Sequence, residues 1–337
     1  MNVAILGIAY HLPERVENND DLQRENPDWR MDDIYAKSGI ETRHIAAVGE
    51  TASDLGYHAA TQLLKRAVVG TEEIDYLLYC TQSPDYFLPS GACILQERLG
   101  LGKHVGALDF NLGCSGFVYG LQLAKSLVVA GAARNVLLVT ADTYTKYIHP
   151  RDRTVRTLFG DGAAVTLIGA SNSGGRLGEF VVGTDGRGAE NLIVPQGGTR
   201  QRSSHQPPPE STDNAGCTRT SENLYMNGPA IFTFAISAIP KAVKTLMDKA
   251  ELSVEQVDKF VYHQANQYML EQLAKRGKIP EDKMLIDVQE LGNTVSASIP
   301  IAIQRAVERG EIRSSHRLVL VGFGVGYSWA ACELQWS

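Results

Sequence analysis

The amino-acid sequence predicts an α/β fold made of two similar halves, a five-layer α/β/α/β/α sandwich with pseudo-twofold symmetry. Two observations predict it: strand-like and helix-like segments alternate along the chain, and a set of them recurs in the second half. Continuous apolar strands alternating with helices are typical of parallel-rich sheets covered by helices. We therefore expect ligand sites at the strand-to-helix turns where the two copies meet.

The recurrence starts with a buried-strand pattern. Residues 74–80 (IDYLLYC) read as an apolar strand entered by an acidic residue, and residues 257–263 (VDKFVYH), about 183 positions later, have the same shape. In each half a glycine-containing turn, a helix pattern and a second apolar strand follow; the turns are 112–116 and 291–294, and the strands are 136–139 and 318–321.

Each half closes on a Phe-Gly-x-Gly turn that leads into an apolar strand, at residues 159–162 and 323–326. The offset between these turns is about 164, so the first half holds roughly 18 additional residues before its turn. This segment, 143–158, is rich in polar and aromatic side chains. A polar excursion in only one copy favours a functional loop over a plain surface loop.

Two segments rich in small and polar residues divide the chain further. We place the boundary between the halves in segment 170–175, which gives an N-terminal half of residues 1–172 and a C-terminal half of residues 173–337. Residues 197–221 are rich in Gly, Ser, Thr and Pro. Because a helix pattern resumes at Ile231, we expect a flexible loop or cap there rather than a linker.

Composition excludes several classes of protein. The chain has 337 residues, of which 44% are hydrophobic and 21% are charged. This composition is typical of a globular protein, and the chain is too long for a single hydrophobic core. The net charge is −6 without a basic stripe, so we expect no nucleic-acid partner. No uninterrupted apolar run approaches the ~18–20 residues of a membrane span. The apolar start lacks a charged region, so we expect no signal peptide and a cytoplasmic protein.

Cys114 is the candidate nucleophile. It lies in a glycine-rich turn between the strand at 106–110 and a helix, and we expect the helix N-terminus to lower its pKa. The five cysteines are scattered without a Cys-x-x-Cys pair, which predicts neither a disulfide framework nor a zinc site. Three others lie within strand or helix patterns, where we expect small buried side chains: Cys80, Cys93 and Cys332.

Two polar residues of the second half complete the candidate site. His263 ends a buried strand, and Asn293 lies in a turn that matches the region of Cys114. Taken alone, a His at a strand end is more often a hydrogen-bonded polar group than a catalyst. An Asn in a glycine-flanked turn more often only stabilises the turn. The pseudo-twofold axis brings both against Cys114, and a thiolate beside two hydrogen-bond donors suits acyl transfer.

Four motifs in order resemble those of the β-ketoacyl-acyl carrier protein synthase III family, of the thiolase fold. They are residues 111–117 (NLGCSGF), 263–266 (HQAN), 292–294 (GNT) and 323–329 (FGVGYSW). The resemblance runs from Val3 to the C-terminus. It implies an acyltransferase that works as a homodimer without a metal or a permanently bound cofactor.

The resemblance also implies a two-step mechanism. Cys114 would take an acyl group from acyl-coenzyme A, with the backbone N–H groups of Cys114 and Val325 as oxyanion hole. His263 and Asn293 would then hydrogen-bond a malonyl thioester, carried by acyl carrier protein or coenzyme A, as carbon dioxide leaves. The resulting enolate would attack the acyl-cysteine and release a β-ketoacyl thioester. This role requires a neutral His263 that donates from Nε2.

The sequence departs from the family pattern around the entrance. The resemblance implies substrate or coenzyme A contacts at five positions: Lys37, Leu88, Arg153, Asn266 and Phe323. The family stacks the adenine of coenzyme A between a Trp and an Arg. Arg153 matches the Arg, but Asp33 stands at the Trp position, where it cannot stack and repels phosphate.

Other departures concern the carrier protein and the acyl pocket. Tyr268 and Thr233 stand where the family has basic residues, and Lys37 replaces an Arg, which loses the bidentate fork. Leu88 replaces an aromatic residue that closes the partner's pocket across the dimer. Together with segment 197–222, these changes predict a specialised substrate, such as an acyl unit of a secondary metabolite or surface polysaccharide.

Three other interpretations stay open. An alcohol or amine could resolve acyl-Cys114 into an ester or amide without decarboxylation, because Asn293 suits an oxyanion either way. A non-catalytic subunit of a heterodimeric synthase is disfavoured, since the nucleophile and both donors are present. A dinucleotide-binding oxidoreductase is disfavoured because residues 7–10 (GIAY) do not continue as Gly-x-Gly-x-x-Gly.

Overall fold

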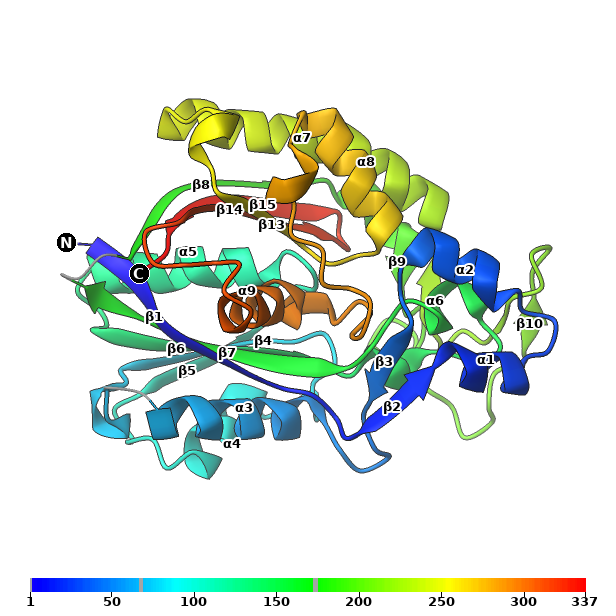
Figure 1. Cartoon of the computed structure of the whole chain (residues 1–337). Helices are drawn as coiled ribbons and strands as arrows, with labels where there is room; N and C mark the ends of the chain where they lie inside the picture. Colours follow the sequence, from blue (N-terminus) through cyan, green and yellow to red (C-terminus); the bar gives the residue numbers. More distant parts are fainter. Residues whose placement is uncertain (1, 67–68, 172–174) are drawn as a thin grey trace.

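Two β-sheets and three helical layers stack in the order α/β/α/β/α (Figure 1). The computed structural model describes residues 2–66, 69–171 and 175–337. The layers confirm the predicted sandwich. The predicted boundary between the halves lies at residues 172–174, outside the described residues, as does Met1 of the expected first strand.

A five-stranded sheet belongs to the first half of the chain. Its order is β1 (Asn2–His11), β7 (Gly162–Ser171), β6 (Asn135–Asp142), β4 (Tyr76–Cys80) and β5 (Gly106–Phe110). Strand β4 is parallel to β5 and β6, whereas β7 is antiparallel to β6 and β1. Helices α3 (Ala52–Arg66) and α4 (Gly91–Arg98) cover its outer face (Figure 1). All eight residues of β6 are buried, as expected for an apolar strand covered on both faces.

A four-stranded sheet of the second half repeats this order. It consists of β8 (Arg176–Thr184), β15 (Ser328–Gln335), β14 (Arg317–Gly324) and β13 (Lys259–Tyr262). Strand β13 is parallel to β14, and β15 is antiparallel to β14 and β8. Thus β13, β14 and β15 correspond to β4, β6 and β7, as the recurring sequence patterns predict. Helices α7 (Gly228–Ala250) and α8 (Gln267–Gly277) cover the outer face (Figure 1).

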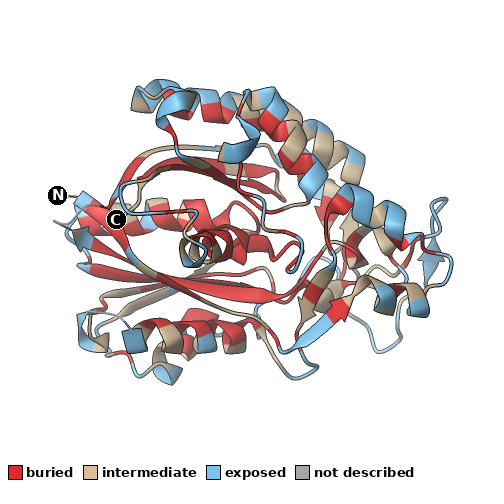
Figure 2. Ribbon diagram, viewed as in Figure 1, coloured by how far each residue is buried: buried red, intermediate tan, exposed pale blue. Residues whose placement is uncertain are grey.

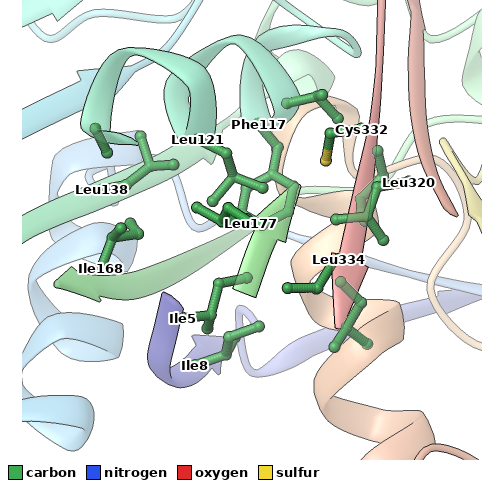
Figure 3. Packing of buried hydrophobic residues seen from close by; sticks show 14 of the residues in the cluster. Ile5, Ile8, Phe117, Leu121, Leu138, Ile168, Leu177, Leu320, Cys332 and Leu334 are labelled. Carbon is green, nitrogen blue, oxygen red and sulfur yellow. The ribbon is translucent and has the colours of Figure 1, made fainter. Parts of the chain in front are cut away.

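The middle layer consists of α5 (Gly116–Val129) and α9 (Ser298–Glu308), which lie between the sheets. Both helices are mostly buried in Figure 2. From α5, Phe117 and Leu121 are fully buried and pack in one cluster with Leu138 and Ile168 of the larger sheet and with strands of the smaller sheet (Figure 3). A helix that is apolar on most sides is stable in this position because it buries those sides against two sheets.

Shorter elements gather at the end of the sandwich opposite the termini (Figure 1). The helices are α1 (Asn19–Glu25), α2 (Met31–Ser38) and α6 (Arg153–Arg156). The strands are β2 (Arg15–Asn18), β3 (Thr42–Ile45), β9 (Leu192–Ile193), β10 (Ser211–Thr212), β11 (Thr218–Arg219) and β12 (Tyr225–Met226). The 3-10 turns are not confined to this end; they are η1 (Thr71–Glu73), η2 (Tyr144–Tyr147), η3 (Gly186–Asn191), η4 (Val254–Gln256), η5 (Glu281–Lys283) and η6 (Val295–Ala297).

Two predicted segments and one predicted side chain differ from expectation in detail. The additional segment 143–158 is not a plain loop, because it forms η2 and α6 and buries Tyr144. Segment 197–221 includes the short β10–β11 hairpin. The expectation of a buried Cys93 is wrong: this thiol is exposed on α4, because a two-sided pattern does not tell which face of a short helix meets the sheet.

Helix α7 is long and apolar enough to cross a membrane, judged by length and composition alone. The core helix of a globular protein meets the same test. In this fold α7 packs against the four-stranded sheet, where Ala235, Ile239 and Leu246 are fully buried. Its apolar stripe is therefore accounted for by the protein core.

Candidate active site

Cys114 lies in the turn between β5 and α5, and it is only 5% exposed. The end of β14 approaches it closely. A Cβ atom on Gly322 would lie 2.7 Å from the Cys114 carbonyl oxygen, and one on Gly324 would lie 3.1 Å from its Sγ. Because a side chain at Gly322 would collide with the Cys114 turn and one at Gly324 would crowd it, these two glycines allow the two halves to meet at this cysteine.

The expected lowering of the Cys114 pKa is wrong for the free enzyme. Burial raises the pKa of this thiol well above its ordinary value, and the nearby Asp142 carboxylate raises it further. Helix α5 begins at Gly116 with Ser115 as its N-cap, so Cys114 precedes the helix rather than lying in its first turn. Desolvation disfavours the thiolate, so the raised pKa corresponds to a neutral thiol at Cys114 in the free enzyme.

His263 follows directly after β13 and is almost completely buried. Burial lowers its pKa to about 3, so the imidazole is neutral at physiological pH. Its Nδ1 lies 2.7 Å from Oγ of Ser298, and the backbone N–H of Gln264 donates to the same Oγ at 3.4 Å. A serine hydroxyl both donates and accepts, so Ser298 can accept from Gln264 and donate its own hydrogen to Nδ1; in that arrangement the ring proton is on Nε2.

Asn293 lies in a turn that joins the two halves. Its backbone N–H donates to the Leu158 carbonyl at 2.8 Å, and its carbonyl accepts from Gly160 N–H at 3.1 Å. The preceding Gly292 has a φ of +63°, a conformation that favours glycine. The side-chain Oδ1 accepts from the backbone N–H of Val295 at 2.9 Å. This bond fixes the amide orientation and leaves Nδ2 as the donor end.

The three side chains share one cavity. Cys114, His263 and Asn293 all line a cavity of about 200 Å³, although they come from three turns far apart in the sequence. Asn266, Phe323 and Gly324 line it as well, and the ring of Phe323 meets His263 edge-on with centroids 5.7 Å apart. Most of the remaining lining is apolar, which strengthens hydrogen bonds from the few polar groups.

The other predicted residues lie around this cavity. Asn266 caps α8 by accepting from Met269 N–H at 2.9 Å. Val325 does not line this cavity but a second one beside it. Arg153, on α6, donates to the Ala215 carbonyl at 3.1 Å, and Lys37 is exposed on α2. Leu88 is 81% exposed and lines neither cavity of its own chain.

Comparisons with known proteins point to one family. Residues 108–186 match the family described as 3-oxoacyl-[acyl-carrier-protein (ACP)] synthase III, and residues 247–336 match its C-terminal part. The beta-ketoacyl-[acyl-carrier-protein] synthase III of Caldanaerobacter subterraneus subsp. tengcongensis is 35% identical, over 99% of this chain and 97% of its own length. The chain belongs to the synthase III family.

Solved structures of the family superpose on the whole chain. A crystal structure of a 3-oxoacyl-(acyl-carrier-protein) synthase III has a TM-score of 0.97 and 50% identity, covering 100% of both chains. A 3-oxoacyl-(acyl-carrier protein) synthase from Burkholderia xenovorans LB400 has a TM-score of 0.92 and 36% identity, over 100% of this chain and 95% of its own. The resemblance stated from sequence is confirmed, and the protein is a thiolase-fold ketosynthase, a transferase of fatty acid biosynthesis.

The mouth of this synthase III cavity is aromatic rather than basic. Tyr268, which is 47% exposed, stacks on Phe232 with ring centroids 5.6 Å apart, and both line the cavity. Thr233 is exposed beside them, and its hydroxyl donates to the Pro229 carbonyl. Asp33 forms an exposed ion pair with Arg30 at 2.6 Å.

Sequence reasoning missed several polar groups around the site. Ser298, which orients His263, is an ordinary helix-start serine in the sequence. The buried Asp142 accepts from the backbone N–H of Gln82 at 2.8 Å and from the Ser296 hydroxyl, and burial raises its pKa to about 7. The only sequence signal was the place of Asp142 at the end of a continuous apolar strand. Within residues 2–66, 69–171 and 175–337, no group of three or more His, Cys, Asp or Glu is arranged to hold a metal ion.

Proposed function

We propose that this synthase III family member transfers an acyl group from acyl-coenzyme A to Cys114 and then condenses it with a malonyl thioester. The product is a β-ketoacyl thioester, carried by acyl carrier protein or by coenzyme A. One observation carries the proposal: a thiol, a neutral imidazole and a carboxamide from three separate turns line one largely apolar cavity. This set matches the demands of thioester chemistry in both steps.

In the first step, Sγ of Cys114 forms a bond to the acyl carbon and the bond from that carbon to the coenzyme A sulfur breaks. The thiol proton leaves with coenzyme A, so charge is balanced. The backbone N–H groups of Cys114 and Val325 serve as the oxyanion hole. A high thiol pKa in the free enzyme fits this step, because the neutral thiol is protected until a substrate fills the cavity.

In the second step, Nε2–H of His263 and Nδ2–H of Asn293 donate to the thioester oxygen of the malonyl group. The bond to the carboxylate breaks, carbon dioxide leaves, and the electron pair forms an enolate. The enolate carbon attacks the acyl carbon, the bond to Sγ breaks, and the Cys114 thiolate so released takes up a proton from water to regenerate the neutral thiol. The low pKa of His263 supports this role, since the ring enters the step as a neutral donor.

The substrate range is part of the proposal. The mouth of the cavity is lined by Phe232 and Tyr268, and position 233 is a Thr rather than a basic residue. The mouth therefore offers little positive charge to an acidic carrier protein. We therefore infer a specialised acyl or malonyl donor rather than the housekeeping initiator of fatty acid synthesis. A family-typical bacterial acyl carrier protein loaded with malonate is the probe: efficient condensation with acetyl-coenzyme A would overturn this part alone.

A homodimer completes the proposal. Strand β5 is the edge of its sheet, and an unpaired edge favours pairing with another chain. Next to it, Tyr86, Phe87 and Leu88 are 63%, 86% and 81% exposed, an apolar patch typical of an interface. Leu88 would then reach the partner's site. A cytoplasmic location also belongs to the proposal, supported by the packing of α7 in the core.

Two measurements test the proposed reaction. Intact mass spectrometry after incubation with acetyl-coenzyme A detects an acyl adduct, which we expect to be lost in Cys114→Ala and retained in Cys93→Ala, whose thiol is exposed on α4. Adding malonyl thioester should release carbon dioxide in step with loss of the adduct. An adduct resolved only by an alcohol or amine favours ester or amide formation, and no adduct favours a non-catalytic subunit.

A further inference from the structure

A second cavity lies beside the one that holds Cys114. Its volume is about 330 Å³. Leu192 lines both cavities, and Cys114, Leu192 and Tyr144 belong to one packed cluster. Gln82, another lining residue, covers Gly113 so closely that a Cβ atom there would collide with its Oε1. The second cavity is therefore within reach of a chain attached to Sγ of Cys114.

The wall of this cavity carries a hydrogen-bonded polar network. The hydroxyl of Tyr144 donates to Oε1 of Gln82, and Nε2 of Gln82 donates to Oδ1 of Asn111 at 2.9 Å. The hydroxyl of Tyr147 donates to the Gln82 backbone carbonyl at 3.3 Å. All four residues line the cavity, and the rest of its lining is mainly apolar: Ala189, Leu192, Ile193, Val194, Leu224 and Val325.

The network has hydrogen-bonding capacity to spare. A carboxamide nitrogen has two hydrogens, and the Gln82 amide uses one of them on Asn111. The Asn111 amide uses its oxygen in the same bond, which leaves its nitrogen as a donor. The Tyr144 hydroxyl donates once and keeps acceptor capacity. A ligand oxygen that both accepts and donates complements this wall.

The charge near the cavity argues against an acidic ligand. None of the residues that line it is Lys, Arg or His. The buried Asp142 carboxylate lies close enough to raise the pKa of Tyr147, in addition to the effect of burial. A carboxylate brought into this cavity would lose its hydration without gaining a cation. The complementary group is therefore a neutral oxygen.

We propose that the second cavity binds the acyl chain on Cys114 and selects short chains that carry a neutral hydroxyl group. This inference rests on the proposed function, because it assigns the acyl donor of that same reaction. Tyr144, Gln82 and Asn111 would hold the hydroxyl, while the apolar wall holds the methylene groups. An unsubstituted acyl chain displaces water from these polar groups without replacing its hydrogen bonds. We therefore expect such a chain to be transferred more slowly.

The test is the rate at which Cys114 becomes labelled by matched donors. Coenzyme A thioesters of 3-hydroxybutanoate, 4-hydroxybutanoate, butanoate and succinate are compared by intact mass at short times. We expect at least one hydroxybutanoyl donor to label about tenfold faster than butanoyl, the effect of one or two net hydrogen bonds, and succinyl to label slowest. Butanoyl labelling as fast as both hydroxy donors overturns the inference and leaves the proposed function standing.

A double variant locates the selection. In Gln82→Leu/Tyr144→Phe we expect the ratio of hydroxybutanoyl to butanoyl labelling to fall toward one, whereas Tyr57→Phe on α3 keeps the wild-type ratio. Both donors are compared on one preparation, so partial unfolding does not change the ratio. A ratio that survives the double variant overturns the inference. No labelling of wild-type Cys114 by any donor, acetyl-coenzyme A included, overturns the proposed function instead.

Discussion

The hydroxyl oxygen of Ser298 lies 2.7 Å from Nδ1 of His263, and it joins the first residue of α9 to the end of β13. Ser298 also accepts from the Gln264 N–H at 3.4 Å, and its own hydroxyl hydrogen is available to Nδ1 of the imidazole. When Ser298 donates to Nδ1, the proton of the ring is on Nε2. In the proposed mechanism, Ser298 therefore orients His263 and favours the tautomer that decarboxylation needs, without contacting the substrate itself.

The first prediction concerns this positioning role. Ser298→Ala removes the bond that fixes the tautomer, so we expect decarboxylation to fall about tenfold, in the range of other lost orienting partners. Acylation of Cys114 does not use Nε2 in the proposed mechanism and should fall less. Single-turnover assays of the two steps give the comparison, with Ser298→Thr as the conservative variant expected to restore activity. Equal losses in both steps would contradict the role.

The second prediction concerns the thiol. Since burial and Asp142 raise the pKa of Cys114, alkylation of the free enzyme by iodoacetamide should be slow at pH 8 and should accelerate steadily above it. Asp142→Asn removes the negative charge, which lowers the thiol pKa and speeds alkylation at pH 8. Glu50→Gln, which changes a half-buried carboxylate outside the site, is the control. A pH profile that levels off below pH 7 in the wild type would show a thiolate and refute this description.

The third prediction concerns stability and pH. Burial raises the pKa of Asp142 from 3.8 to about 7, so the folded state holds this proton more tightly than the unfolded state does. Its contribution to the free energy of unfolding is fully present below pH 3.8 and is lost as the pH rises toward 7. Asp142→Asn should flatten this part of the curve. Urea unfolding at several pH values measures the difference, and parallel curves would count against it.

The fourth prediction concerns the Asn293 turn. Gly292 has a φ of +63°, and a Cβ atom there would lie 2.6 Å from the Leu158 carbonyl oxygen. Gly292→Ala therefore adds a clash to backbone strain, and we expect a loss of more than about 1 kcal/mol together with most activity. Gly310→Ala is the matched control, since Gly310 has a φ of +73° with nothing within 4 Å. Equal losses in stability would mean that the Leu158 contact costs nothing.

The fifth prediction concerns the middle layer. Phe117 is fully buried between the sheets, so Phe117→Ala should cost about 3–5 kcal/mol of unfolding free energy. Val129, at the end of the same helix, is 60% exposed, and Val129→Ala should change stability by less than about 0.5 kcal/mol. Denaturant melts give both values. Similar values for the two variants would place α5 outside the core.

Sequence was sufficient for the parts of this molecule that depend on local pattern and repetition. The strands at β4 and β13 share spacing and burial, and the glycines around Cys114 and Asn293 mark the turns that precede α5 and α9. Placing those turns together needed only the symmetry of the repeat. The symmetry of the repeat predicts that Cys114, His263 and Asn293 meet at one cavity, as they do. Their chemical roles stay predictions.

Other properties depend on tertiary neighbours that no local pattern specifies. The pKa of Cys114 is set by the depth of its burial and by Asp142, which comes from β6 in a different part of the chain. The orientation of His263 depends on Ser298, thirty-five residues later. The exposure of Cys93 depends on how α4 is rotated against its sheet. Each effect arises from packing between segments far apart in the sequence.

Carbon dioxide release from the pre-acylated enzyme tests the central claim most directly. Enzyme carrying an acetyl group on Cys114 is mixed with carboxyl-labelled malonyl-coenzyme A and malonyl-acyl carrier protein, and released label is measured in a single turnover. The account predicts one carbon dioxide per acyl-cysteine, a loss of at least a hundredfold in His263→Ala and Asn293→Ala, and an adduct that still forms in both. Undiminished release in these two variants would contradict it.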